Sequence, residues 1–398
     1  MRLPERIRRV NVSSFGIPAG ELTQPAQFQF DYREKSPWVS LTMDPSHNRS
    51  YNLGTLHPVF AQNLPEGYVR RYLHERLIRH ANVNDLYLLA LQGHKGIGHL
   101  AFESDLELVP ASKMELDDIL NWQGKNSLFE VLLERYYLNG LVSGVQPKVV
   151  VTIESKSVIQ QEDVIVKTFD EEYPLLTVNE FVCMSAARAV GLNPPDFWLS
   201  KDLKSFVIRR FDRTEQGECL GFEDFTVLMN KSNNQKYQSS YENVLKAVQL
   251  FTKTPAEVER AYQLIVFSCL IGNGDAHLKN FAIQYRAGRN AVKLSPPYDI
   301  THTLVYDTLD KNMALKLSGS KQFPARATLE DLGKKFGIKK PDEIVEALGQ
   351  GILEYLARSE EVRLMTGLRE SITHQVSTAL SRHKGIVVPR RDKQKKFS

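Results

Sequence analysis

Apolar and polar residues alternate along the first part of the chain in patterns that predict both strands and helices. The segments FQFDY, from Phe28, and WVSLTM, from Trp38, alternate with a period of two, which is typical of strands with one buried face. The stretch LPEGYVRRYLHERLIRHANVNDLYLLALQG, from Leu64, instead places its apolar residues at helical spacing. Residues 1–108 are therefore predicted to form a mixed α/β unit.

Between residues 128 and 211 the pattern predicts a loop, a strand, a helix and a second strand. LFEVLLERYYL leads into the glycine-containing turn SGVQPK at 143–148, and DVIVKTF is a short strand rich in β-branched residues. TVNEFVCMSAARAVG carries its apolar residues on about one helical face, and Gly191 with the two prolines after it is expected to end this helix. SFVIRRF, from Ser205, predicts the next strand.

From about residue 238 the pattern becomes helical. Two capping boxes, Ser239 with Glu242 and Thr254 with Glu257, are expected to begin helices, and helical spacing continues through IVEALGQGILEYLARS and LRESITHQVSTALSRH. A strand-rich front followed by a helical back predicts an α+β fold. The units expected after the first are 109–237, 238–385 and a basic tail at 386–398.

Length and composition fit a cytoplasmic protein with two or three packed sub-domains. The chain has 398 residues, 42% of them apolar and 25% charged, and no run of eighteen apolar residues that could cross a membrane. No apolar run follows the basic N-terminus, so it does not resemble a secretory signal. The three cysteines, Cys183, Cys219 and Cys269, lie far apart, which argues against a disulfide framework or a structural zinc site.

Charge alone does not indicate that the whole chain binds nucleic acid. The net charge is only +4. Basic residues gather at the end, in RHKGIVVPRRDKQKKFS, and this composition favours a solvated, disordered tail. Contact of the tail with DNA or with an acidic partner is the alternative.

The most informative segment is IGNGDAHLKNFAIQY. Asp275 and Asn280 stand five residues apart, which is also the separation of the Asp and Asn in the catalytic loop of protein kinases. That chemistry needs a carboxylate that accepts the proton of a substrate hydroxyl and an amide oxygen that binds Mg²⁺. His277 and Lys279, between them, are candidates for contact with phosphate oxygens.

A second acid follows at Asp299, in LSPPYDITHT. The apolar segments FAI and VKL between the two sites predict a short hairpin that would return Asp299 to the side of Asn280. Two oxygen ligands placed in this way could share Mg²⁺ with the phosphates of ATP.

Two further pieces lie upstream. Lys167 ends the strand VIVK, as does the kinase lysine that contacts the α- and β-phosphates, and Glu180 on the next helix is its natural partner. The turn SGVQPK is predicted to bind the phosphates of ATP, because a glycine lets backbone N–H groups approach phosphate closely. The residues of this turn assigned to ATP are Ser143, Gly144, Val145, Gln146 and Lys148.

Each piece taken alone has a simpler explanation. Asp and Asn are common turn formers, a lysine after a strand is commonly solvated, and a glutamate near a helix start interacts favourably with the helix dipole. His277 and His302 could form a metal pair, but no HxxE or HExxH spacing supports one. The order of the pieces favours a kinase, since glycine turn, lysine strand, acidic helix, Asp-x4-Asn loop and second Asp follow one another as a kinase requires.

Over nearly the whole chain, these blocks resemble the HipA family of bacterial serine/threonine kinase toxins. SGVQPK, IVK, NEFVCMSAARAVGL, VIRRFDR, EDF, IGNGDAHLKNF and LSPPYDI are similar to its successive motifs. NLPEGYVRRYL with LLALQGHKGIGHLAFE resembles the family's N-terminal domain. GNGDAHLKN followed by PYD is the most specific of these matches.

The resemblance implies a two-lobed protein-kinase-like fold that uses ATP and Mg²⁺. Residues 109–237 would be the N-lobe and 238–385 the helical C-lobe. Asp275 would be the catalytic base, Asn280 and Asp299 the magnesium ligands, and Lys167 the phosphate contact. The backbone at Arg210 and Phe211 would meet adenine.

The resemblance also implies partners and a form of regulation. Some members phosphorylate aminoacyl-tRNA synthetases, and a small helix-turn-helix antitoxin pairs with the toxin and binds operator DNA. A serine in or near the glycine turn is autophosphorylated in family members. Some carry it at the position of Leu141 here, so Ser143 is the remaining candidate in this sequence.

Two other functions remain open at this point. The same lysine and metal ligands would serve a kinase for a small molecule or lipid. A repressor subunit that binds antitoxin and DNA but turns over little ATP is the other alternative, although the presence of all four catalytic positions argues against it.

Overall fold

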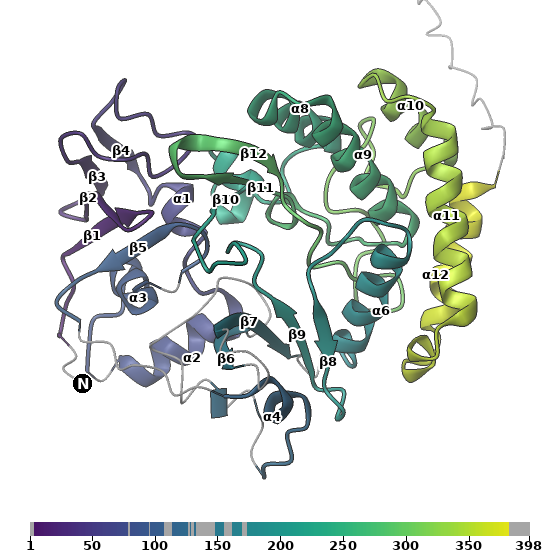
Figure 1. Cartoon of the computed structure of the whole chain (residues 1–398), viewed down its shortest axis with the longest axis horizontal. Coiled ribbons are helices and arrows are strands. Elements are labelled where there is room, and N and C mark those ends of the chain that lie inside the picture. The colour runs from purple at the N-terminus through teal and green to yellow at the C-terminus, as the bar shows by residue number, and fades with distance from the viewer. Residues whose placement is uncertain are drawn as a thin grey trace, which may run out of the picture.

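The first part of the protein is an antiparallel sheet with helices packed beside it (Figure 1). The computed structural model describes residues 4–78, 80–94, 96–106, 114–125, 128, 131–132, 148–154, 161–168 and 173–381. The first sheet has five strands in the order β4-β3-β2-β1-β5. Its elements are β1 (Arg9–Ser14), β2 (Ile17–Thr23), β3 (Phe28–Tyr32), β4 (Ser50–Gly54), β5 (Leu100–Glu103), α1 (Pro58–Ala61), α2 (Gly67–Leu77) and α3 (Asp85–Gln92).

The sequence predictions for this part are confirmed except for one strand. FQFDY forms β3, and the predicted helices are α2 and α3. WVSLTM is not a strand, because it makes only an isolated bridge between Ser40 and Met43. Its backbone N–H groups bond to side chains instead: Val39 donates to the Tyr32 hydroxyl at 3.0 Å and Leu41 to the Glu223 carboxylate at 2.7 Å.

A second antiparallel sheet, of four strands in the order β6-β7-β9-β8, lies at the centre of the molecule (Figure 1). Helix α6 packs on one face of this sheet. The predicted helix and the strands before and after it are therefore confirmed, and Gly191, with φ +83°, follows the end of α6 as expected. The elements are β6 (Lys148–Glu154), β7 (Gln161–Thr168), β8 (Phe197–Leu199), β9 (Ser205–Arg209), α6 (Leu176–Ala189) and, before them, α4 (Leu116–Leu120).

The two faces of the central sheet belong to different hydrophobic cores. Side chains alternate between the faces of a strand, so Val164 and Val166 of β7 pack into the core of the N-terminal sheet. Ile165 and Lys167 point to the opposite face, where they line the main pocket. The N-terminal sheet unit therefore supports the strand that carries Lys167 from behind.

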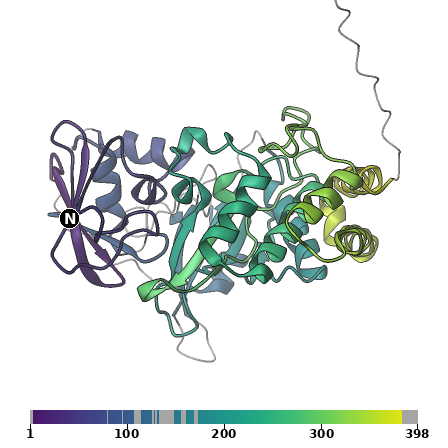
Figure 2. The ribbon, with the colours of Figure 1, turned by 90° about the horizontal axis from the view of Figure 1, so that it is seen from above.

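The rest of the chain is mostly helical and forms the end of the molecule opposite the N-terminal sheet (Figure 2). A small antiparallel sheet, in the order β10-β11-β12, connects this helical part to the N-terminal unit through the hydrogen bond from Gln62 to the carbonyl of Phe222. Helix α11 packs against α6, α9, α10 and α12. The elements are β10 (Gly221–Asp224), α7 (Phe225–Leu228), η1 (Asn233–Gln235), α8 (Tyr241–Thr252), α9 (Pro255–Leu270), η2 (Leu278–Asn280), β11 (Ala282–Arg286), η3 (Ala287–Arg289), β12 (Asn290–Leu294), α10 (Arg326–Lys335), α11 (Pro341–Arg358), η4 (Glu361–Leu364) and α12 (Leu368–Leu380).

Both predicted capping boxes are wrong, although α8 and α9 begin where they were expected. The cap of α8 is Ser240, whose side chain accepts from the N–H of Asn243, while the Glu242 carboxylate accepts from Ser318 N at 2.8 Å. Thr254 precedes α9 without capping it through its side chain. The Glu257 carboxylate accepts from Leu294 N at 2.8 Å. In both cases the glutamate therefore bonds to a backbone N–H that is distant in the sequence.

Cys183, Cys219 and Cys269 are all free thiols. Among the described residues, no helix combines the length and the apolar character that a membrane span would need.

Candidate active site

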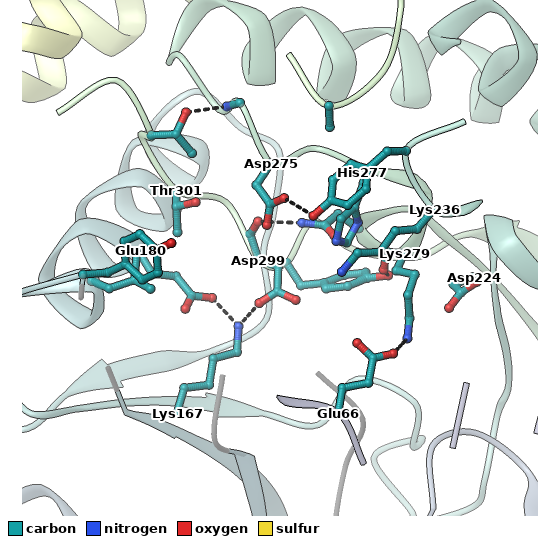
Figure 3. A pocket seen from close by; sticks show the side chains of 18 of the residues that line it. Glu66, Lys167, Glu180, Asp224, Lys236, Asp275, His277, Lys279, Asp299 and Thr301 are labelled. Atoms are coloured by element: carbon teal, nitrogen blue, oxygen red, sulfur yellow. Dashed lines mark hydrogen bonds and ion pairs between the residues drawn. The ribbon is translucent and has the colours of Figure 1, made fainter. Parts of the chain in front are cut away.

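The main pocket has a volume of about 720 Å³ and is lined by all three parts of the chain. Ile165 and Lys167 come from the central sheet, Asp275 and Asp299 from the helical part, and Glu66 from the N-terminal unit. Figure 3 shows that the labelled acidic and basic side chains converge on one space. Residues that are more than two hundred positions apart in the sequence therefore meet in one cavity.

Lys167 lies between two carboxylates at one side of this pocket (Figure 3). It forms ion pairs with Glu180 of α6 and with Asp299, and the side chains of Lys167 and Glu180 are only 4% and 1% exposed. Burial alone would lower the pKa of Lys167, but Asp299 and Glu180 together hold it above its usual value. Lys167 therefore remains a cation, and the predicted pairing with Glu180 is confirmed.

The hairpin after the Asp-x4-Asn loop returns Asp299 to the side of Asn280, as predicted. Strands β11 and β12 form the hairpin, and Asn280 Nδ2 donates to the backbone carbonyl of Asp299 at 3.2 Å. The Tyr298 hydroxyl donates to the carbonyl of Lys279 at 2.8 Å and ties the same two segments again. Asp299 has a φ of +54°, in the left-handed region that is uncommon for residues other than glycine. Such backbone conformations persist where surrounding contacts enforce them, often at functional sites.

The loop that carries Asp275 is fixed by its neighbours. Gly274 N donates to Thr303 Oγ1 at 2.9 Å, and the Tyr241 hydroxyl donates to the carbonyl of Ala276 at 3.2 Å. Gly272 has a φ of +75°, and a Cβ there would lie 2.7 Å from His302 Nδ1. This position therefore requires glycine. Asp275 itself accepts a hydrogen bond on Oδ1 from the hydroxyl of Tyr237 at 3.1 Å.

His277 and Lys279 both line the pocket, but neither is a solvated cation. Burial, together with Lys236, lowers the pKa of His277 to about 3, so its ring is neutral at ordinary pH. Its Nδ1 is buried and has no hydrogen-bond partner among the described residues. Lys279 pairs with Glu66 at 2.5 Å. Contact of these two residues with phosphate stays a prediction.

The side chain of Arg210 forms a buried ion pair with Asp212, and both residues line the pocket. Its Nε donates to Asp212 at 2.8 Å, and a terminal nitrogen donates to the carbonyl of Gly96 at 2.7 Å. Burial alone would raise the pKa of Asp212, but Arg210 and Arg213 lower it to about 2. The neighbouring ring of Phe211 packs against those of Phe222 and Tyr298. Arg210 and Phe211 both line the pocket, and the predicted contact of their backbone with adenine stays a prediction.

Part of the predicted glycine turn lies outside the described residues. This applies to Ser143, Gly144, Val145 and Gln146, and to the predicted autophosphorylation of Ser143. Lys148 begins β6, where its backbone pairs with that of Lys167. The basic tail at 386–398 is likewise outside the described residues.

Sequence reasoning missed Glu66, Gln62 and Tyr237 as lining residues of the pocket. Glu66 belongs to the LPEG segment, which the sequence singled out only as part of a resemblance. Gln62 donates to the carbonyl of Phe222 at 3.0 Å and so joins the N-terminal unit to β10. No pattern around Tyr237 indicated that it would contact the Asp-x4-Asn loop.

The pair of Lys279 with Glu66 yields a prediction about stability. Glu66→Gln should lower the free energy of unfolding by about 1.5–3 kcal/mol, the usual contribution of charged hydrogen bonds. Glutamine can still accept a hydrogen bond from Lys279, but it removes the negative charge that compensates the largely buried ammonium group. Both side chains are largely buried, with exposures of 10% and 17%, so water will screen the pair only weakly. Chemical denaturation measures the effect, with Glu75→Gln on exposed α2 surface as the matched control. Equal stability of Glu66→Gln and wild type would contradict this prediction.

Comparison with known proteins agrees with the fold. The model of the HipA N-terminal domain matches residues 10–103, and that of the HipA-like C-terminal domain matches residues 140–356. The HipA protein in the HipA–HipB–operator DNA complex of Shewanella oneidensis superimposes with a TM-score of 0.67 at 19% identity, over 93% of this chain and 96% of that one. The fold is therefore α+β, two-lobed and kinase-like, as predicted. The chain belongs to the HipA family.

Relatives in other bacteria carry kinase names. The putative kinase Y4dM of Sinorhizobium fredii is 29% identical over an alignment that is 390 residues long, gaps included. This alignment covers 86% of this chain and 90% of that protein. A putative kinase of Haemophilus influenzae is 30% identical over 226 residues, which cover 52% of this chain and 65% of that protein.

Proposed function

We propose that this protein is an ATP- and Mg²⁺-dependent serine/threonine protein kinase that acts as the toxin of a toxin–antitoxin pair. The observation that carries the proposal is the convergence of Lys167, Glu180, Asp275, Asn280 and Asp299 on one pocket. Each of these side chains has the chemistry of one position in the protein-kinase site. Their arrangement in space supports the roles that their order in the sequence suggested.

The donors at Asn280 and Asp299 suit a hard cation. Mg²⁺ prefers oxygen ligands and keeps several water or phosphate oxygens, so few protein ligands are needed. The described residues include no group of three or more His, Cys, Asp or Glu side chains that would hold a metal alone. When bound, Mg²⁺ would neutralise charge on the β- and γ-phosphates. Asn280 would offer its amide oxygen and Asp299 its carboxylate, while Lys167 would turn its ammonium group toward the phosphates.

Asp275 would act on the acceptor. Its carboxylate would accept a hydrogen bond from the substrate hydroxyl, orient that oxygen for attack on the γ-phosphorus, and take its proton as the new bond forms. The backbone of 210–211 would hold adenine. The turn with Ser143, Gly144, Val145, Gln146 and Lys148 would cover the phosphates. Autophosphorylation of Ser143 would add roughly −1.5 to −2 charges and oppose nucleotide binding there.

The partners follow from the family. A helix-turn-helix antitoxin would bind this chain, and contact with operator DNA would occur through that complex, by analogy with the complex of the Shewanella protein. The substrate would be a protein of the translation machinery, with an aminoacyl-tRNA synthetase as the first candidate. Phosphorylation of such a protein would arrest growth.

Labelling with radioactive ATP tests this function. Purified protein incubated with Mg²⁺, γ-labelled ATP and a cell lysate should transfer label to a protein, and Asp275→Asn should not. Label in a metabolite or lipid instead would indicate a small-molecule kinase. No transfer at all, with intact binding of antitoxin, would support the co-repressor alternative.

A second variant tests the metal site. Asp299→Ala should weaken the binding of Mg-ATP by about 10–100-fold or more, which is the range found for groups around a bound metal. The binding of metal-free ATP should weaken much less. Calorimetric titration with Mg²⁺ and with EDTA measures both affinities. Equal losses under the two conditions would assign Asp299 a structural role through Lys167 instead.

A further inference from the structure

A short segment of chain lies directly against the loop that carries Asp275. It contains η1, which is closed by a capping box between Ser232 and Gln235. Leu278 N donates to the carbonyl of Lys236 at 3.2 Å, and Lys279 Nζ approaches Asn233 Oδ1 at 3.5 Å. The residue that follows Lys236 is Tyr237. These contacts fix the backbone of Tyr237 beside the proposed catalytic loop.

The hydroxyl of Tyr237 bonds to the proposed base. It donates to Asp275 Oδ1 at 3.1 Å. Burial and the nearby Asp275 carboxylate raise the pKa of the Tyr237 phenol above its usual value, so the phenol keeps its proton and remains a donor. A neutral hydroxyl that donates to a catalytic carboxylate has the same chemistry as the acceptor hydroxyl of a kinase substrate.

The ring of Tyr237 is partly exposed, so its side chain can change conformation. The residue is 41% exposed at the pocket. Its ring contacts are an edge-on approach to His277, with 5.2 Å between centroids, and the Lys236 ammonium group 5.2 Å away. An exposed side chain can change rotamer on a fast timescale. The hydroxyl can therefore leave Asp275 without unfolding of the segment.

We infer that Tyr237 occupies, in the absence of substrate, the place on Asp275 that the acceptor hydroxyl must take. The inference rests on the proposed kinase function and adds a device to its acceptor site. An arriving serine or threonine hydroxyl displaces the phenol. Until then Tyr237 keeps water away from the base, and so protects bound ATP from hydrolysis.

The reaction that Tyr237 suppresses is transfer to water. A water molecule on Asp275 would form a bond from its oxygen to the γ-phosphorus, while the bond from that phosphorus to the bridging oxygen of ADP breaks. Asp275 would take a proton from the water, and ADP and phosphate would leave. With a protein acceptor the serine or threonine oxygen takes the place of the water, and the remaining steps are the same.

Tyr237→Phe provides the test, because it removes the hydroxyl and keeps the ring. Hydrolysis of Mg-ATP without any protein acceptor should rise about fivefold, which corresponds to the ~1 kcal/mol of one net hydrogen bond. Tyr262→Phe is the matched control, since it removes a buried phenol that donates to the carbonyl of Leu329 at 3.0 Å outside the pocket. The control should leave the rate unchanged.

Three results would overturn the inference. The first is an unchanged or lower rate of hydrolysis in Tyr237→Phe, which would mean that the phenol positions Asp275 for catalysis. The second is persistence of the raised rate in the double variant with Asp275→Asn. The third is phosphate on Tyr237 itself, found by peptide mass spectrometry, because the phenol would then be a substrate.

The kinase proposal can fail separately. If wild-type protein transfers label to a lysate protein in an Asp275-dependent manner, the proposed function stands whatever Tyr237→Phe does. If neither protein shows Asp275-dependent transfer to protein or to water, the proposed function fails and the inference fails with it.

Discussion

Asp275→Asn should lose phosphoryl transfer by about 10²–10⁴-fold while it keeps its affinity for ATP, because a positioned acid or base contributes a rate factor of that size. An asparagine has nearly the same shape as aspartate and can still accept the hydrogen bond from Tyr237, so the loop should keep its structure. It cannot take a proton from the acceptor at ordinary pH. The loss should therefore appear in kcat, measured by transfer of label from ATP to protein.

The matched control for this prediction is Asp307→Asn. Asp307 has a fully exposed side chain on the segment after Asp299, and its pairing with Lys311 spans 3.9 Å. A surface pair of this kind contributes little. Growth arrest on expression should follow the same order, with wild type and Asp307→Asn toxic and Asp275→Asn harmless. Near-normal transfer by Asp275→Asn would remove this residue from the role of base.

Local pattern was enough to predict the elements around the site. The β-branched strand ending near Lys167, the apolar face of α6 and the two short strands after Asn280 all have clear periodicity, and all are present. Their order along the chain then predicted which polar side chains would meet. The ion pair of Lys167 with Glu180 and the position of Asp299 beside Asn280 could therefore be predicted from local sequence.

Contacts made by the N-terminal unit could not be predicted in this way. Glu66 and Lys279 are 213 positions apart, and nothing in either local sequence identifies the other. The same holds for Glu223, which is buried and accepts from Leu41 N and from the hydroxyls of Ser40 and Tyr285. The predicted strand at WVSLTM failed for this reason, because a distant carboxylate takes part of its hydrogen bonding. Helix capping by Thr254 failed similarly, since its partner Glu257 bonds elsewhere.

These long-range contacts change the interpretation of the N-terminal unit. Its core includes Val164 and Val166, on the reverse side of the strand that presents Lys167 to the pocket. Its loop at 96–98 accepts from Arg210 and donates to Asp212, next to the predicted adenine segment. Glu66 holds Lys279 in the proposed catalytic loop. The unit therefore supports the site at three points, and it is part of the kinase-like body rather than an appended module.

Lys167→Met should combine a large loss of stability with a large loss of nucleotide affinity. The side chain of Glu180 is 1% exposed, and without Lys167 its charge would be buried next to Asp299 with no cation between them. Removal of one partner from a buried ion pair costs about 3–5 kcal/mol. Loss of a charged contact with phosphate should raise the Kd for ATP by about 10–100-fold, since such hydrogen bonds contribute roughly 1.5–3 kcal/mol. Denaturant unfolding and titration with ATP measure the two effects, with exposed Lys204→Met as control.

The double variant Lys167→Met with Glu180→Gln separates these two effects. A neutral amide at 180 removes the uncompensated buried charge, which is the main cost of breaking a buried ion pair. Most of the lost unfolding free energy should therefore return. The affinity for ATP should remain low, because a lysine acts on phosphate as a point charge that neither methionine nor glutamine replaces. If the double variant regains normal ATP binding together with its stability, Lys167 supports the fold only and contributes no contact to the nucleotide.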